Sequence, residues 1–327
     1  MVHALVLGLL ALPGALAWTP PPPIVNGSET DDYPAVGALV LENDGDMYGS
    51  YCSGTLVDRY WVITAAHCVE ALNEDYRSYN TYFVIGGNLL QGEIDEYALV
   101  TQAIEFPSWN ETSMAGDIGL LELDNDGENG GQGIRNTTPM PVNDDDVTSS
   151  WEGDDMRLVG FGITSDNNHN SGDIKRTADV PVWGYDSAFI YTFDQAAGQN
   201  ACSGDSGGAG LEILGGSSFE LAGIISFGWA PHGGQPCTDG ALAMTRVDRY
   251  LYWIEDYVDL EADSDADTDT DPTWDTGTDD PKRPNDVDGT ATDGWMGGCS
   301  VSPARTSHGL GLLLALLGLI LAPRRRK

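Results

Sequence analysis

Positive charge is scarce in this chain of 327 residues, which carries 15 Lys and Arg residues against 51 Asp and Glu residues. The formal net charge at pH 7 is -36. A surface this acidic repels phosphate groups, so the composition excludes a nucleic-acid-binding protein. The hydrophobic content of 41% is nevertheless enough to build a substantial core, as one large domain or two modest ones.

Cysteine is also scarce, with five residues and no CxxC spacing among them. The first 17 residues are apolar and end in Ala-Leu-Ala, which predicts a secretory signal peptide over residues 1–17. This run is too short for a membrane anchor and is interrupted by Pro13 and Gly14. Export places the cysteines in an oxidising compartment, where we expect disulfide pairing rather than metal binding.

Short β-type runs separated by Gly and Asp turns dominate the chain after residue 24. We expect strands over residues 35–41, 61–66, 82–86, 118–123, 156–163 and 219–227. Runs at this frequency are typical of an all-β barrel or sandwich. One helical pattern follows over residues 247–258, where Val247, Leu251, Ile254 and Val258 fall on one face.

The next segment alternates Asp with small residues, and residues 259–293 hold 13 acids and two bases. Like charges at this density cannot bury a core, so residues 259–298 are predicted to be a disordered acidic linker. The alternative is a Ca²⁺ site, because repeated carboxylates suit this ion. The run lacks the Gly turn and the distal bidentate Glu of a Ca²⁺ loop, which favours the solvated linker.

The last segment, residues 299–327, contains an apolar run over 310–322 and ends in PRRRK. With the Gly-Cys-Ser sequence around Cys299, it resembles the C-terminal sorting tails of myxobacterial surface proteins. That resemblance implies processing and lipid attachment at Cys299. It predicts an exported protein that is attached to the cell surface or outer membrane through its tail, or released. The alternative is an ordinary C-terminal anchor in which Cys299 has no role.

A possible acyl-transfer site is spread over three motifs. Such chemistry on a serine needs a base, a carboxylate that orients the base, and donors for the oxyanion. Ser206 lies in the glycine-rich stretch CSGDSGGAG, which could also be a simple turn. Of the five histidines, His67 alone follows an apolar strand, and Asp117 directly precedes one. Glycine at position 204 would let the amides of Gly204 and Ser206 converge on one point.

The motifs ITAAHC, DIGLLEL and GDSGG occur in that order and resemble the His, Asp and Ser motifs of the chymotrypsin and trypsin family. The resemblance extends from IVNG at Ile24 to the predicted helix. It includes FGIT at Phe161, where the family more often has Trp. It implies a protease domain over residues 24–258, built from two six-stranded antiparallel β-barrels with the site between them and a C-terminal helix.

On this resemblance, His67 is the general base and acid, Asp117 holds its tautomer, and Ser206 is the nucleophile. Gly204 and Ser206 supply the oxyanion amides. The implied activity is the hydrolysis of peptide bonds by a serine endopeptidase. We expect a monomer that acts on peptide or protein substrates and needs no metal or other cofactor.

The resemblance also implies a substrate-binding segment and two disulfides. Ser226, Phe227 and Gly228 match the segment that pairs with the substrate backbone as an edge strand. The implied disulfides are Cys52–Cys68 and Cys202–Cys237, which leaves Cys299 over.

Family members are activated when a new N-terminus turns inward and its ammonium pairs with the aspartate beside the nucleophile. Ile24 and Asp205 are the matching residues, so residues 18–23 are predicted to be a short propeptide. Pro23 stands before Ile24 where family members carry Arg or Lys. We therefore expect a protease other than a trypsin-like one to cut this bond.

The specificity pocket departs from that of trypsins. Asn200, six residues before Ser206, stands where trypsins carry Asp, so the pocket offers no negative charge to Arg or Lys. We expect a preference for an uncharged or polar side chain. Leu242 falls near a position usually held by Gly, which predicts a narrowed pocket.

Two other functional classes fit parts of the sequence. A family member that has lost a triad residue can persist as an inert binding protein. The acidic linker could instead be the working part of a Ca²⁺-dependent surface adhesion protein. All three motif residues are present here, which favours the hydrolase.

Overall fold

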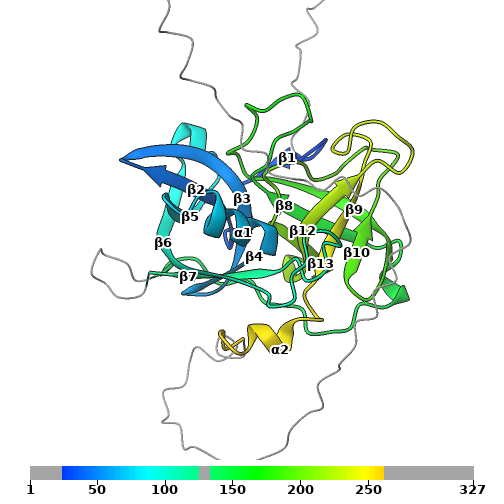
Figure 1. Cartoon of the computed structure of the whole chain (residues 1–327). Helices are drawn as coiled ribbons and strands as arrows, with labels where there is room; N and C mark the ends of the chain where they lie inside the picture. The colour runs from blue at the N-terminus through cyan, green and yellow to red at the C-terminus, as the bar shows by residue number, and fades with distance from the viewer. Residues whose placement is uncertain (1–23, 125–132, 261–327) are drawn as a thin grey trace, which may run out of the picture.

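The computed structural model of the protein describes residues 24–124 and 133–260. These residues form two β-barrels, as Figure 1 shows, and the expected architecture of two six-stranded antiparallel barrels is confirmed. The predicted signal peptide, propeptide and sorting segment lie outside the described residues, as does almost all of the acidic linker. Within the described ranges, no helix has the length and apolar content needed to span a membrane.

The first barrel closes in the order β2-β3-β4-β7-β6-β5. Its strands are β2 (Val36–Asn43), β3 (Asp46–Asp58), β4 (Trp61–Thr64), β5 (Asn80–Gly86), β6 (Ile94–Glu105) and β7 (Gly119–Leu123). Apolar side chains from different strands meet in one cluster, in which Leu39, Ile63, Phe83 and Leu121 are fully buried. Burial of this surface is the main stabilisation of the barrel, because the inner face is shielded from water on all sides.

The second barrel runs in the order β9-β10-β13-β12-β11-β8, and pairing of β8 with β9 closes it. Its strands are β8 (Asp155–Gly160), β9 (Arg176–Tyr185), β10 (Phe189–Thr192), β11 (Ala209–Gly215), β12 (Ser218–Trp229) and β13 (Ala241–Arg246). The short strand β1 (Ser28–Glu29) adds to β9. A second buried cluster fills this barrel and includes Ile24, Ile190 and Leu242.

Short helical segments connect the strands. The α1 helix (Ala66–Glu74) lies between β4 and β5, and two single turns, η1 (Leu89–Gln91) and η2 (Ser149–Trp151), occur in loops. The predicted strand 61–66 therefore ends early, at Thr64. Ala65 is still extended, but its carbonyl already accepts from the amide of Val69 at 3.3 Å, which starts α1.

The C-terminal helix α2 (Leu251–Ile254) is much shorter than the predicted range 247–258. The expected apolar face is nevertheless largely correct, because Val247, Ile254 and Val258 are all buried in the cluster that includes the core of the first barrel. Val247 cannot be helical, since its amide donates to the carbonyl of Ala222 at 3.0 Å as a continuation of β13. The periodicity therefore predicted correctly which side chains are buried, whereas the hydrogen bond to Ala222 keeps Val247 out of the helix.

Candidate active site

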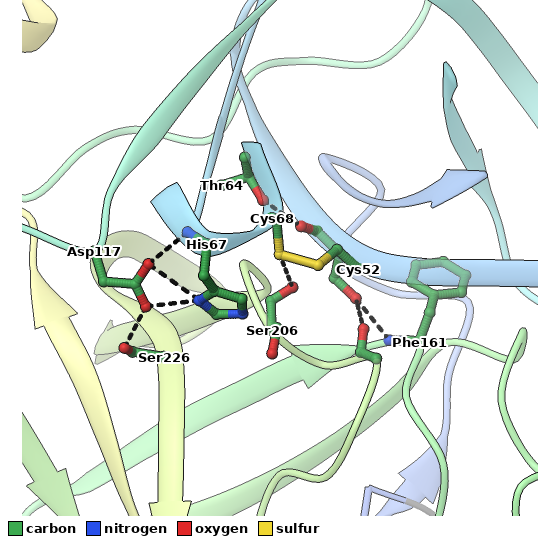
Figure 2. The surroundings of a disulfide bond; sticks show 10 residues. Cys52, Thr64, His67, Cys68, Asp117, Phe161, Ser206 and Ser226 are labelled. Atoms are coloured by element: carbon green, nitrogen blue, oxygen red, sulfur yellow. Dashed lines mark hydrogen bonds and ion pairs between the residues drawn. A yellow bond between two sulfur atoms is a disulfide. The ribbon is translucent and has the colours of Figure 1, made fainter. Parts of the chain in front are cut away.

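The three motif residues come from segments that are distant in the sequence. His67 is in the first turn of α1, Asp117 is two residues before β7, and Ser206 is in the loop that leads into β11. The first two belong to the first barrel and the third to the second barrel. Figure 2 shows the imidazole ring of His67 between the carboxylate of Asp117 on one side and Ser206 on the other.

Asp117 orients His67 through both backbone and ring. Its Oδ1 accepts from the backbone amide of His67 at 2.9 Å, and its Oδ1 and Oδ2 lie 3.0 and 2.9 Å from the ring Nδ1 (Figure 2). A carboxylate only accepts hydrogen bonds, so these contacts place a proton on Nδ1. In the neutral ring the acceptor is then Nε2, the nitrogen on the side of Ser206.

Asp117 is fully buried and is held from the second barrel by two hydroxyl groups. Ser226 Oγ donates to its Oδ2, and Thr245 Oγ1 donates to its backbone carbonyl at 2.9 Å. A buried carboxylate needs such donors, because removal from water is costly unless hydrogen bonds replace it. Nothing in the sequence pattern pointed to Thr245, which lies in an apolar strand.

The hydroxyl of Ser206 and the Nε2 of His67 are both buried and have no hydrogen-bond partner within the described residues. The Ser206 hydroxyl can donate a hydrogen bond, and Nε2 of the neutral His67 ring can accept one. Hydrogen bonds between catalytic groups are often long in the absence of substrate and shorten when it binds. The two unpaired atoms on facing side chains are therefore suited to a proton transfer.

The electrostatic surroundings of His67 favour its charged form. Burial of the ring opposes protonation, but the charge and hydrogen bond of Asp117 outweigh it, with a smaller contribution from Glu70. The net effect raises the pKa of His67 above its usual value of 6.5. The ring can thus hold a proton taken from a neighbouring hydroxyl at neutral pH.

The loop around Ser206 leaves two backbone amides free. Those of Gly204 and Ser206 donate no hydrogen bond to any residue within 24–124 or 133–260. Gly204 has a φ of 94°, and a Cβ at this position would lie 2.9 Å from the Cα of Gly162. Only glycine tolerates both conditions, so the backbone shape of this loop depends on residue 204.

Ser53 ties this loop to the first barrel, a role that the sequence did not reveal. Its amide donates to the carbonyl of Ser206 at 2.8 Å, and its Oγ donates to the carbonyl of Gly204 at 2.9 Å. The same Oγ accepts from the amide of Phe161 at 3.1 Å. Ser53 is fully buried, so one small polar side chain joins three segments.

Asp205 lies in the same loop, between Gly204 and Ser206, and is fully buried. Its Oδ1 accepts from the amide of Gly162 at 2.7 Å, and its Oδ2 accepts from the amide of Cys202 at 2.9 Å. Burial raises the pKa of Asp205 from 3.8 to about 6, although these two amides and the charge of Arg176 oppose the rise. The carboxylate is thus held in a place where its charge is costly.

Ile24 is also fully buried, in the core of the second barrel. No hydrogen bond or ion pair joins it to Asp205 among the described residues. In the unprocessed chain the nitrogen of Ile24 belongs to a peptide bond and carries no charge. The structure therefore places the two residues that the resemblance pairs on the same barrel, with no hydrogen bond or ion pair between them among the described residues.

Both disulfides implied by the sequence are confirmed. Cys52–Cys68 joins β3 to α1 beside His67, and Cys202–Cys237 joins the start of the Ser206 loop to the segment before β13. The sulfur of Cys68 lies 3.6 Å from the carbonyl oxygen of Ser206 (Figure 2). Each bond closes a loop of a size for which cross-linking typically contributes about 3 kcal/mol to stability.

One group of potential metal ligands occurs in the part of the chain that the structure describes, formed by Cys52, His67 and Cys68. The two sulfur atoms are bonded to each other, and metal binding by cysteine requires a thiolate. His67 is engaged with Asp117. These three residues therefore cannot act together as ligands of a metal ion.

The end of β12 presents a free edge. Residues Phe227–Trp229 pair with β13 only, because the pairing of β12 with β11 ends at Ile224. A register shift between Ile225 and Phe227 marks a bulge at Ser226. Unpaired backbone groups at such an edge can accept an extended peptide as an additional strand.

Asn200 is almost fully buried and presents an unsatisfied acceptor. Its Nδ2 donates to the carbonyl of Pro236 at 3.0 Å, while its Oδ1 has no partner within the described residues. Leu242 is also fully buried, in the same cluster as Ala201, and its Cα lies opposite that of Gly228. A neutral amide and a bulky apolar side chain therefore occupy positions that the resemblance assigned to the specificity pocket.

Comparison with known proteins identifies the family of the chain, and it is the family that the three sequence motifs resemble. The trypsin family matches residues 24–254, and the chain belongs to it. Rat chymotrypsin-like elastase family member 1 is 28% identical over 255 residues, which cover 72% of this chain and 89% of the relative. Melanization protease 1 of Drosophila melanogaster is 27% identical over 268 residues, which cover 72% of this chain and 65% of the relative. Thrombin-like enzyme CPI-enzyme 2 of Gloydius ussuriensis is 28% identical over 235 residues, which cover 68% of this chain and 81% of the relative.

The raised pKa of His67 can be measured by NMR titration of the histidine rings, with His67→Gln used for assignment. We expect a midpoint above 6.5 in the unmodified chain. Asp117→Asn should lower the midpoint below 6.5, because burial then acts without the opposing carboxylate. By linkage, this pair stabilises the folded chain below pH 6.5, and the contribution is lost as the pH rises through the folded pKa.

Glu70→Gln is the matched control, because it removes a weaker charge that also faces the ring. We expect it to lower the midpoint by less than Asp117→Asn does. An unchanged midpoint in Asp117→Asn would contradict the assigned electrostatics of the pair.

Proposed function

We propose that the chain is a secreted or surface-anchored serine endopeptidase that hydrolyses peptide bonds through Ser206, His67 and Asp117. The strongest support is the buried pair of Asp117 and His67, whose free ring nitrogen faces the serine hydroxyl (Figure 2). Membership of the trypsin family and the protease names of the relatives agree with this activity.

In the first half of the reaction, Ser206 Oγ attacks the carbonyl carbon of the scissile bond and its proton passes to Nε2 of His67. Asp117 keeps the other ring proton on Nδ1 and stabilises the imidazolium that forms. The carbonyl oxygen takes up the displaced electron pair and accepts hydrogen bonds from the amides of Gly204 and Ser206. One such donor typically contributes about 3–4 kcal/mol to transition-state stabilisation.

In the second half, the C–N bond breaks and His67 returns its proton to the leaving amine, which leaves an acyl group on Ser206. A water molecule then attacks the ester carbon and gives its proton to Nε2. The ester bond breaks, and Ser206 regains its proton from His67. No metal ion or other cofactor is required by these steps.

The free edge of β12 would bind the substrate as an additional strand beside Ser226, Phe227 and Gly228. This arrangement would place the scissile carbonyl near Ser206, because Ser226 also donates to the carboxylate that orients His67. The side chain before the scissile bond would then enter the pocket that holds Asn200. We infer a preference for uncharged or polar side chains, since no carboxylate is present at that position.

The surroundings of this activity are proposed from the sequence. The signal peptide would export the chain, and the tail with Cys299 would attach it to the cell surface unless it is released. Removal of residues 18–23 by a protease that accepts Pro23 would give Ile24 a free ammonium group to pair with Asp205. The domain would act as a monomer on peptide or protein substrates.

The nucleophile can be identified with a fluorophosphonate, which reacts with serines activated in this way. We expect covalent labelling of the processed chain at Ser206, located by mass spectrometry. Ser206→Ala should abolish labelling and lower kcat on a peptide substrate by at least about four orders of magnitude. Ser217→Ala, at an exposed turn between β11 and β12, is the control and should label normally.

An inert binding protein on this scaffold would give the opposite result. The folded, processed chain would then remain unlabelled, and Ser206→Ala would change neither its labelling nor any slow peptide hydrolysis. That outcome would refute the proposed activity.

The preference at the pocket can be tested by cleavage of a peptide library. We expect kcat/KM after Arg or Lys to be at least about tenfold below that after the best uncharged residue, because the cation would be buried without a counter-charge. Asn200→Asp should raise cleavage after Arg and Lys relative to the other residues. Asn143→Asp changes another buried asparagine, whose amide donates to Asp145 rather than to Pro236, and should leave this ratio unchanged.

Cleavage after Arg or Lys with the efficiency of a trypsin in the unmodified chain would overturn this assignment. So would an equal effect of the two asparagine substitutions on the ratio.

A further inference from the structure

Arg176, the first residue of β9, is a buried cation that the proposed reaction does not use. Its side chain is 3% exposed, although arginine is rarely buried without a carboxylate partner. Its Nη1 donates to three backbone carbonyls, and its Nε is buried without a partner among the described residues. Its ion pair with the exposed carboxylate of Glu29 is long at 3.8 Å. These contacts leave the charge of the guanidinium largely uncompensated by direct pairing.

Gly162 lies between this guanidinium and the carboxylate of Asp205. Its carbonyl accepts from Arg176 Nη1 at 3.3 Å, and its amide donates to Asp205 Oδ1 at 2.7 Å. Gly160, which pairs with Arg176 in the β8–β9 ladder, borders the same carboxylate, since a Cβ there would lie 2.4 Å from Asp205 Oδ1. Two glycines thus let Asp205 pack against backbone that Arg176 contacts on the other side.

Charge favours an interaction between the two residues. Asp205 is fully buried, and Arg176 is the charged group among the described residues that lowers the pKa of this carboxylate. Arg176 in turn faces the carboxylates of Glu29 and Asp173 as well as that of Asp205. Charges in a buried setting interact over longer distances than at the surface, because solvent screening is weak there.

The location of Asp205 connects this interaction to the site. Asp205 lies between Gly204 and Ser206, and the same Gly162 that Asp205 and Arg176 contact would collide with any side chain at position 204. In the unprocessed chain, the nitrogen of Ile24 has no charge to offer to Asp205. A different cation must therefore stabilise the ionised carboxylate if the loop is to keep its shape before processing.

We propose that Arg176 is a positioning residue that serves as an internal counter-charge for Asp205, acts through Gly162, and holds the Gly204–Ser206 loop in its reactive shape before the bond to Ile24 is cut. This inference rests on the proposed function of Ser206. It follows that the unprocessed chain already has a reactive Ser206, and that processing adds a second positive charge to a loop that Arg176 has formed.

The test compares the rate constants of fluorophosphonate labelling at Ser206 in two forms of the chain. One form begins at Trp18. The other begins at Ile24 and is obtained from a Pro23→Arg variant by trypsin, which is then removed, and N-terminal sequencing verifies both. Arg176→Gln removes the charge and keeps a polar side chain for the carbonyls, whereas Arg176→Lys keeps the charge.

We expect Arg176→Gln to lower the rate constant about tenfold or more in the form that begins at Trp18, because the buried carboxylate of Asp205 then has no counter-charge to hold the loop. In the form that begins at Ile24 the loss should be less than about threefold, because the new ammonium compensates. Arg176→Lys should retain most of the rate in both forms. The acid limb of the rate should also move to higher pH in the uncut Arg176→Gln chain and return in Arg176→Lys.

Arg246→Met is the control for the loss of a buried guanidinium from the same barrel, since Arg246 pairs with Asp248 away from the loop. This variant should leave unchanged the ratio of the labelling rate constants of the form that begins at Trp18 and the form that begins at Ile24. Equal losses in both forms of Arg176→Gln, no loss in either, or a loss in Arg176→Lys as large as in Arg176→Gln would overturn the inference. If the unmodified cut chain itself fails to label, the proposed function fails and the role of Arg176 fails with it.

Discussion

The buried hydrogen bonds between Asp117 and His67 are the interaction on which the rest of the site depends. They fix the ring by its Nδ1 and by the backbone of the same residue, so that Nε2 can only face Ser206. A carboxylate in this position is stable only because hydroxyls of Ser226 and Thr245 reach it from the second barrel. The site therefore exists only when both barrels are folded and in contact.

The loop from Gly204 to Ser206 is held by polar groups in the same way. Ser53 fixes the carbonyls of Gly204 and Ser206 from the first barrel, and Asp205 anchors the loop to Gly162 of the second barrel. The amides of Gly204 and Ser206 donate to no group among the described residues and so remain available. Orientation of these groups before substrate binds is what makes them effective in a reaction, since no energy is spent on arranging them later.

The sequence predicted the parts of this arrangement that depend on short motifs. His67, Asp117 and Ser206 were identifiable because acyl transfer needs those residue types, and the cysteine pairs followed from the family resemblance. It did not predict residues that act through distant contacts: Ser53, Thr245 and Arg176 are polar residues in strands, and only the folded barrels show what they touch. The helix over 247–258 was overestimated for the same reason, because a sheet hydrogen bond to Val247 outweighs helical periodicity.

A crystal structure of the chain processed at Ile24 and inhibited with a peptide boronic acid would test the central claim most directly. The account predicts a covalent bond from Ser206 Oγ to boron and one boronate oxygen about 2.7–3.1 Å from the amides of both Gly204 and Ser206. His67 Nε2 should then lie within hydrogen-bond distance of Ser206 Oγ or of the second boronate oxygen. A boronate bound elsewhere, or one whose oxygens avoid both amides, would contradict the account.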